Sequence, residues 1–205
     1  MKTGQFTTLA KPVEGVVFKE RNSKFLGYAY PVTDETRIEA LLSRLRKQHG
    51  KANHVCYGWQ LGTDPVIWRV NDDGEPNNSA GMPIYGQIQA FGLTNILIAV
   101  VRYFGGTKLG VGGLISAYRK TAQLTLEEGK TVTKTVLKNL TVECDYKDAH
   151  QVMQMVKRHR MKILSQKNEM RVQFILGIPL NNYKEALDHL RDLAGVTVEG
   201  DPELE

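Results

Sequence analysis

The segment Asn95–Ala117, NILIAVVRYFGGTKLGVGGLISA, runs from an aliphatic stretch through a glycine-rich loop into a second apolar stretch. Residues 96–101 are all aliphatic, which is typical of a central strand buried on both faces. The loop glycines are Gly105, Gly106, Gly110, Gly112 and Gly113. Glycine accepts a positive φ and leaves the backbone bare, at a cost of roughly 0.5–1 kcal/mol relative to alanine inside a regular element. The pattern therefore predicts a strand, a loop that needs its bare backbone, and a helix over residues 113–128.

The start of that helix is a candidate anion site. The first N–H groups of a helix have no partner within the helix and carry partial positive charge, and Arg102 and Lys108 flank them here. Neither standard phosphate motif matches: Leu109 follows Lys108 where a P-loop has Ser or Thr, and Ile115 stands where the dinucleotide fingerprint has Gly or Ala. An anion or phosphate-backbone site and a purely structural turn that packs the helix onto the strand both remain open.

Composition is that of a soluble globular protein. The 205 residues are 41% hydrophobic and 24% charged, which suits one large domain or two small ones. The longest aliphatic run, residues 96–101, is too short to cross a bilayer, and the N-terminus lacks a signal-peptide core. We therefore expect a cytoplasmic protein with no membrane contact. Cys56 and Cys144 are isolated, and His54 with Cys56 supplies only half a metal site, so we expect no disulfide, metal or cofactor.

Charge is unevenly distributed along the chain. Residues 1–134 carry 17 basic and 11 acidic side chains, a net +6, whereas residues 135–205 carry 10 and 11, a net −1. An anionic partner would prefer the N-terminal part. A solvated basic surface without a partner explains the same count.

Periodicity predicts two domains, residues 1–134 and 135–205. In the second, strands are predicted near residues 140–144, 161–164, 170–178 and 196–198, with helices near 149–156 and 186–193. The order βαββαβ is that of a ferredoxin-like domain. In the first, strands are predicted at 13–20, 24–32, 54–61, 66–70 and 96–104. A helix capped by Thr33 or Asp34 and ended by Gly50, and a short helix from Pro83 to Gly92, complete it, and we expect an irregular junction near 129–135.

A polar loop from Arg69, RVNDDGEPNNSAGMP, is the second candidate site. If the strands ending at Val70 and Phe104 are parallel neighbours, loops 71–82 and 105–113 leave the same sheet edge, where open α/β sheets place ligands. The candidate residues are Arg69, Asp72, Asp73, Gly74, Glu75, Pro76, Ser79 and Gly81. Their carboxylates allow three interpretations: a structural network with Arg69, a magnesium or ligand contact, or acid–base catalysis. No nucleophile triad is supported, and His54 is either a packed, hydrogen-bonded residue or faces the same cleft.

Both loops resemble signatures of the YigZ/IMPACT family. The matching segments are Arg69–Pro76 (RVNDDGEP) followed by Ser79–Pro83 (SAGMP), and Val101–Leu114 (VRYFGGTKLGVGGL). The contexts of Ser23–Phe25 and His54 also fit, and length and two-part layout match the bacterial YigZ members across essentially the whole chain. The segment Val55–Trp59 departs from the pattern, because relatives more often carry Asn-Cys-Tyr-Ala-Tyr there.

The resemblance implies an α+β fold built as an α/β sandwich. Its N-terminal domain is of the kind shared by ribosomal proteins and the fourth domain of elongation factor G, and its C-terminal domain is ferredoxin-like, similar to that factor's fifth domain. Eukaryotic relatives regulate translation, but they do so with an additional domain, so their regulatory partner does not carry over to this sequence.

The leading hypothesis is a non-enzymatic, translation-associated protein that binds RNA or the ribosome. Arg102, Lys108 and the glycine-loop N–H groups would contact phosphates, and Lys24, Arg119 and Lys120 would extend the surface. One alternative is an enzyme that acts on a phosphorylated small molecule between loops 71–82 and 105–113, with Asp73 or Glu75 as acid or base. Another is a protein-interaction module that uses the exposed sheet of the ferredoxin-like part.

Overall fold

The computed structural model describes residues 4–199, and the chain divides into two compact units. One unit is Phe6–Lys134. The other combines the residues up to Gln5 with the segment that begins at Thr135. Helices and mainly antiparallel sheets occur in both, which confirms the α+β class. The sequence pattern did not predict that residues before Phe6 group with the second unit.

The first unit is built on a five-stranded sheet in the order β2-β3-β6-β4-β5. The strands are β2 (Val13–Glu20), β3 (Ser23–Pro31), β4 (His54–Leu61), β5 (Ile67–Asn71) and β6 (Ile96–Tyr103). The aliphatic strand β6 is central, as its composition predicted. The prediction that β5 and β6 are parallel neighbours is wrong, because β4 lies between them and is antiparallel to both. The two strands still run in the same direction, so the loops that follow them leave the same edge of the sheet.

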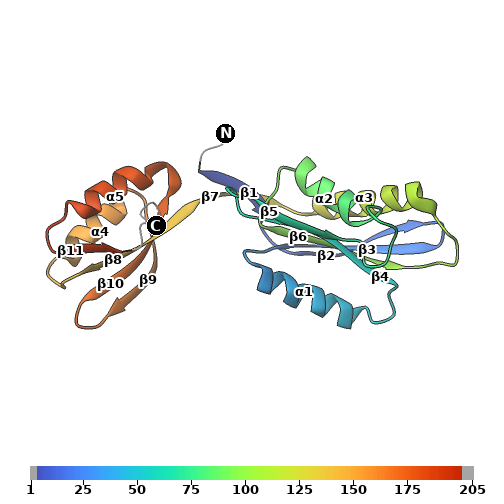
Figure 1. Ribbon diagram of the computed structural model, residues 1–205, viewed down its shortest axis with the longest axis horizontal. Coiled ribbons are helices and arrows are strands. Elements are labelled where there is room, and N and C mark those ends of the chain that lie inside the picture. The colour runs from blue at the N-terminus through green and yellow to red at the C-terminus, as the bar shows by residue number, and fades with distance from the viewer. Residues whose placement is uncertain (1–3, 200–205) are drawn as a thin grey trace. The chain divides into compact units, whose positions relative to one another are not determined.

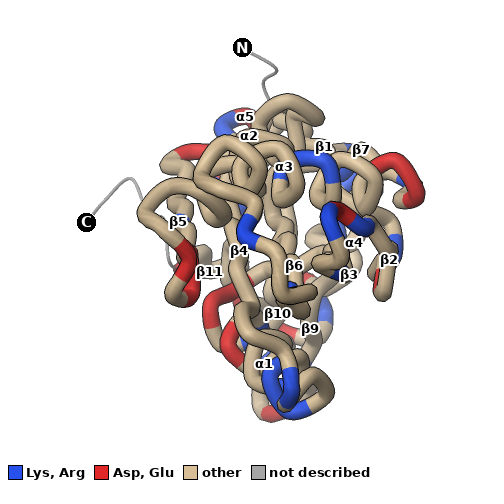
Figure 2. Tube along the Cα trace, turned by 90° about the vertical axis from the view of Figure 1, so that its right-hand side faces the viewer, with Lys and Arg blue, Asp and Glu red and all other residues tan. Residues whose placement is uncertain are grey.

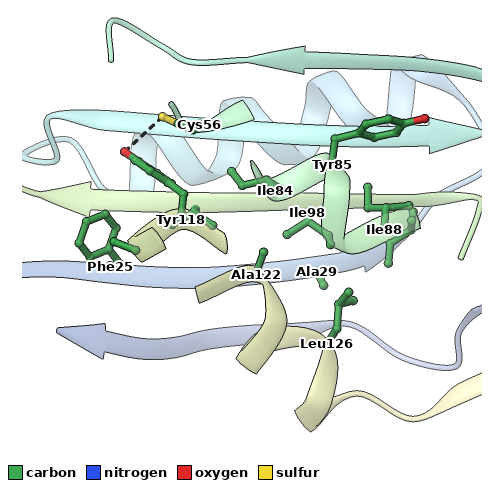
Figure 3. Packing of buried hydrophobic residues seen from close by; sticks show 14 of the residues in the cluster. Phe25, Ala29, Cys56, Ile84, Tyr85, Ile88, Ile98, Tyr118, Ala122 and Leu126 are labelled. Carbon is green, nitrogen blue, oxygen red and sulfur yellow. Dashed lines mark hydrogen bonds between the residues drawn. The ribbon is translucent and has the colours of Figure 1, made fainter. Parts of the chain in front are cut away.

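Helices cover both faces of this sheet (Figure 1). Helix α1 (Glu35–Gln48) lies on one face, and α2 (Gly81–Ala90) and α3 (Gly110–Glu128) lie on the other. Strand β6 contributes side chains to the hydrophobic cores on both faces of the sheet. Val100 belongs to the core beneath α2 and α3, and Val101 belongs to the core beneath α1. Figure 3 shows the first of these cores, with Tyr118 reaching from α3 toward Cys56 on β4.

Two of the helices begin earlier than their sequences predict. Helix α2 begins at Gly81, two residues before Pro83, because the Asp72 carboxylate accepts hydrogen bonds from the backbone N–H groups of Ala80 and Gly81. Helix α3 begins at Gly110, within the glycine loop itself. Helix α1 agrees with one of the two predicted caps: the Asp34 carboxylate accepts a hydrogen bond from the Arg37 N–H at 2.8 Å.

A two-stranded sheet that includes most of the expected irregular junction was not predicted. It pairs β1 (Gln5–Leu9) with β7 (Thr131–Thr135). The polar composition of residues 129–135 led us to expect an irregular junction. Its strand conformation depends on a partner more than 120 residues away in sequence, and no local periodicity signals such a pairing.

The second unit has the predicted βαββαβ order. Its elements are β8 (Leu137–Cys144), α4 (Ala149–Arg158), β9 (Lys162–Asn168), β10 (Val172–Pro179), the 3-10 turn η1 (Leu180–Asn182), α5 (Tyr183–Arg191) and β11 (Val196–Glu199). The antiparallel sheet has the order β11-β8-β10-β9, and α4 and α5 close one shared hydrophobic core with it. Within residues 4–199, each helix is too short or too polar to span a membrane.

Candidate functional site

A cavity of about 480 Å³ lies where four segments of the first unit meet. These segments are the start of β4 with the residue before it, the loop after β5, the end of β6 and the start of α3. Its lining residues include His54, Glu75, Arg102, Lys108 and Gly110. The two loops that the sequence singled out therefore line one cavity, even though the strands before them are not neighbours.

Arg102 is buried at the bottom of this site. Its side chain is 6% exposed, and its Nη1 donates a hydrogen bond to Glu75 Oε1 at 2.6 Å. The guanidinium also lies 5.5 Å from the ring centres of both Phe25 and Phe104. These contacts argue against Arg102 as the main phosphate contact, because Glu75 neutralises its charge and two rings flank its guanidinium, although its side chain lines the cavity.

Glu75 is surrounded by polar groups despite its burial. Besides Arg102, it accepts a hydrogen bond from the Tyr118 hydroxyl at 2.7 Å, and His54 Nε2 lies 3.8 Å from the same carboxylate oxygen. Burial raises the pKa of Tyr118 far above its ordinary value, so the phenol stays protonated and remains a donor. Burial likewise raises the pKa of Cys56, whose Sγ lies 3.3 Å from the Tyr118 hydroxyl. The arrangement therefore concentrates two hydrogen-bond donors and a nearby imidazole on one oxygen of the Glu75 carboxylate.

The two aspartates of the polar loop accept hydrogen bonds from other groups of the first unit. Asp72 accepts hydrogen bonds from three backbone N–H groups between Asn78 and Gly81, at 2.8 to 2.9 Å. Asp73 accepts two hydrogen bonds from Arg46, at 2.8 and 3.0 Å, and one from the Val55 N–H at 2.7 Å. Of the three interpretations of these acids, the contacts match the structural network.

Arg69 is not the cation of that network. Its Nη1 lies 3.9 Å from Glu35, and its guanidinium lies 5.9 Å from the centre of the Trp59 ring, on the exposed surface of β5. The loop carboxylates pair instead with Arg46 and Arg102. Sequence proximity to the acids suggested Arg69, but in an extended strand a residue three positions away points elsewhere.

The remaining residues of the polar loop shape its path. Gly74 has a φ of +88°, a conformation that favours glycine. The Ser79 hydroxyl donates to the Pro76 carbonyl at 2.6 Å. A Cβ on Gly81 would lie 2.9 Å from the Asn71 backbone nitrogen, so this position requires glycine for close packing.

The glycines of the second loop differ in why they are needed. A Cβ on Gly105 would lie 2.0 Å from the Asn22 carbonyl oxygen, so packing requires its absence. Gly106 and Gly110 have φ values of +87° and +73°. Gly113 is tight against Leu109, at 3.1 Å. Gly112 does not have a positive φ, and an added Cβ there would have no packing neighbour within 4 Å. The fold therefore does not explain why glycine occupies this position.

The start of α3 opens toward the cavity. Leu109 is the N-cap residue and provides no side-chain hydrogen bond to the first turn. Lys108 is exposed beside it and lines the cavity. Phe104 and Val111 are 44% and 52% exposed and also line it. A cation, helix N–H groups and apolar surface therefore occur together, a combination suited to an anionic ligand with an apolar part.

The other predicted basic residues lie apart from this cavity. Lys24 neighbours the buried Phe25 in β3 and so points to the opposite face of the sheet, where its charge helps to lower the pKa of His49. Arg119 and Lys120 are exposed on α3, more than two helical turns beyond Lys108. Figure 2 shows a further concentration of basic residues along α1. The predicted surface from Lys24 to Lys120 is therefore not one continuous site.

Sequence reasoning assigned no role at the site to three residues that contribute to it. Ser23 Oγ accepts a hydrogen bond from Arg102 Nη2 at 3.3 Å, and Asn53 Oδ1 accepts one from the Phe104 N–H at 2.8 Å. Tyr118 is the third. Its hydroxyl within an apolar helix was the available signal, because a buried tyrosine requires a hydrogen-bond partner.

Comparisons with known proteins agree with these loops and with the fold. Residues 21–126 match the model of the Impact N-terminal domain. An IMPACT family member from Haemophilus influenzae is 33% identical over 82% of this chain and 83% of its own length. The IMPACT family member YigZ of Escherichia coli is 34% identical over 67% of this chain and 68% of its own. A crystal structure of a hypothetical protein, 26% identical, covers 98% of this chain and 99% of that one with a TM-score of 0.74. The chain therefore belongs to the YigZ/IMPACT family.

Proposed function

We propose that this protein is a translation-associated regulator that binds RNA or the ribosome through the Lys108 surface, defined as residues 104–113. The regulatory part rests on the resemblance to the YigZ/IMPACT family, which implies a role in translation for the eukaryotic relatives. The binding part of the proposal depends on the geometry of the first unit.

The observation that carries the proposal is the exposed Lys108 beside the start of α3, which has no side-chain cap. Phosphate oxygens accept hydrogen bonds from such N–H groups, and the helix dipole favours their negative charge. The open space around Gly112 lets a ligand approach the backbone closely. Lysine adds a mobile cation that needs no fixed orientation.

The apolar part of the surface favours single-stranded RNA over a duplex. Phe104 is 44% exposed beside Lys108, and its backbone is held by Asn53. An exposed aromatic ring next to a phosphate-binding cation is the arrangement on which unpaired bases stack. Ribosomal RNA offers such bases in its loops and bulges.

The contacts of Asp73 and Glu75, the predicted acid–base groups, weigh against the enzymatic alternative. Asp73 accepts hydrogen bonds from Arg46 and from the Val55 N–H, and Glu75 accepts them from Arg102 and Tyr118. Both carboxylates are therefore held by stabilising donors on the protein. Their contacts match structural roles, which favours binding over catalysis.

A salt titration tests the proposal. Purified protein is titrated with ribosomes, with ribosomal RNA and with an unrelated polyanion at several salt concentrations. We expect tighter binding to ribosomes or ribosomal RNA than to the polyanion, with a log–log salt slope of about −0.7 for each phosphate contact on single strands. Equal affinity for all three, or binding that does not change with salt, would contradict the proposal and direct attention to a protein partner.

A further inference from the structure

Two histidines and a glutamate converge on the helices of the second unit. His159 Nε2 lies 2.9 Å from His189 Nδ1, and the possible ligand atoms of His159, Glu185 and His189 all lie within 4.8 Å of one another. None of these residues contributes to the Lys108 surface, which belongs to the first unit. The cluster therefore needs an explanation of its own.

The fold fixes this arrangement. His159 follows the last turn of α4, where its N–H donates to the Met155 carbonyl at 2.9 Å and its own carbonyl accepts from Asn182 Nδ2 at 3.4 Å. It is only 3% exposed. Glu185 and His189 are four residues apart on α5 and so share one face of that helix. The backbone around His159 is thus fixed by hydrogen bonds, and its imidazole lies near Glu185 and His189, two possible ligands on a neighbouring helix that are less buried than His159.

We propose that His159, Glu185 and His189 bind a divalent metal ion of the zinc type. Two imidazoles and one carboxylate form a common protein ligand set for zinc, which leaves a fourth position for water. Imidazole nitrogen favours zinc and similar transition metals over magnesium and calcium, which prefer oxygen ligands. The donor set therefore selects the class of ion.

The distance between the two imidazole nitrogens is close to the one that such an ion requires. With metal–nitrogen bonds of about 2.0–2.1 Å, tetrahedral geometry places two nitrogens about 3.3–3.4 Å apart. The two imidazole nitrogens at 2.9 Å need to separate by only about 0.4–0.5 Å. His189 and Glu185 are on the accessible side of the cluster, so their side chains can make this adjustment while His159 stays in place.

The competing explanation is a simple hydrogen bond between the two imidazoles. In that case one ring donates its N–H to the other, and Glu185 is an unrelated surface carboxylate. The two explanations differ in what Glu185 does. Only metal binding requires its carboxylate oxygen.

Isothermal titration of the full chain with zinc, after removal of bound metal by a chelator and dialysis, tests the proposal. The variants are His189→Ala and Glu185→Gln, and the matched control is His150→Ala, which removes an exposed histidine from α4 of the same unit. We expect one zinc ion per chain, binding weakened roughly 10-fold or more in both variants, and an unchanged control. Zinc should also raise the unfolding midpoint of the wild type and of His150→Ala, because it binds only the folded cluster.

Three results would overturn the proposal. They are no zinc binding by the wild type, equal binding by Glu185→Gln and the wild type, or equal losses in the variants and the control. Circular dichroism in the presence of chelator establishes that each variant is folded. Glu185 is exposed, so its substitution keeps the test valid if His189→Ala unfolds the unit. Because the Lys108 surface is not involved, failure here leaves ribosome binding unaffected, and the reverse also holds.

Discussion

Arg102 and Glu75 form a buried ion pair, 2.6 Å apart, that joins the central strand β6 to the polar loop after β5. Tyr118 of α3 donates to the same carboxylate. Together with Tyr118, the pair links β6, the loop after β5 and α3, three of the elements that line the cavity. It also keeps Arg102, one of the predicted phosphate contacts, buried, and leaves Lys108 as the exposed cation in the lining.

Substitution Glu75→Gln should destabilise the first unit by about 3 kcal/mol. Removing one partner of a buried pair leaves the other charge buried without compensation, even though glutamine keeps the size of the side chain. Urea unfolding followed by tryptophan fluorescence measures the loss, since both tryptophans, Trp59 and Trp68, lie in this unit.

The matched control for that experiment is Glu14→Gln. Glu14 pairs with Arg44 on the surface, where both side chains are about half exposed. Exposed pairs contribute about 0–1 kcal/mol, so little change is expected. Equal losses of unfolding free energy in the two variants would show that the buried Arg102–Glu75 pair stabilises the protein no more than an exposed pair does.

Two glycine substitutions in the second loop should differ in their effect on stability. Gly105→Ala places a Cβ against the Asn22 backbone and should cost about 1–3 kcal/mol. Gly112→Ala enters open space in the first turn of α3 and should be neutral or stabilise by up to about 1 kcal/mol. Thermal unfolding of both variants provides the comparison. A strongly destabilising Gly112→Ala would mean that the fold itself needs this glycine.

Protonation of His49 should destabilise the first unit at mildly acidic pH. Its imidazole lies between the hydroxyls of Tyr28 and Tyr103, at 2.7 and 2.9 Å. Burial, and then the charge of Lys24, lower the pKa of His49 below 6.5, the ordinary value expected in the unfolded chain. The unfolded state therefore binds this proton more readily. The stabilising contribution is complete above pH 6.5 and is lost as pH falls toward the folded pKa.

Urea unfolding with tryptophan fluorescence, repeated between about pH 5.5 and 8, measures this effect. His49→Gln should flatten the pH dependence of the unfolding free energy, whereas His150→Gln, in the other unit, should leave it unchanged. A His49→Gln protein whose slope equals that of the wild type would assign the pH dependence to other groups.

Much of the fold was predictable because its signals are local. The aliphatic run of residues 96–101 predicted a central strand, and Asp34 was one of two predicted caps for α1. Alternation and helical spacing predicted the ferredoxin-like order of the second unit. Each of these features depends on residues close together in sequence.

The unpredicted features depend on contacts between distant residues. Arg102 is neutralised by a carboxylate 27 positions away, and α2 starts early because Asp72 caps it from the preceding loop. The pairing of β1 with β7 spans most of the first unit. At the candidate site, the sequence indicated both loops, but it could not separate the exposed Lys108 from the buried Arg102, because both are basic residues in or near the glycine-rich loop.

The most direct test of the proposed function compares ribosome affinity for Lys108→Ala and Lys130→Ala. Both residues are exposed lysines of the first unit, so each substitution removes one charge, but only Lys108 lines the cavity. Both variants should unfold at nearly the wild-type temperature. Lys108→Ala should bind ribosomes several-fold more weakly, with a salt slope smaller in magnitude by about 0.7, while Lys130→Ala should bind as the wild type does. Unchanged binding by Lys108→Ala, or equal losses in both variants, would contradict a binding site at the Lys108 surface.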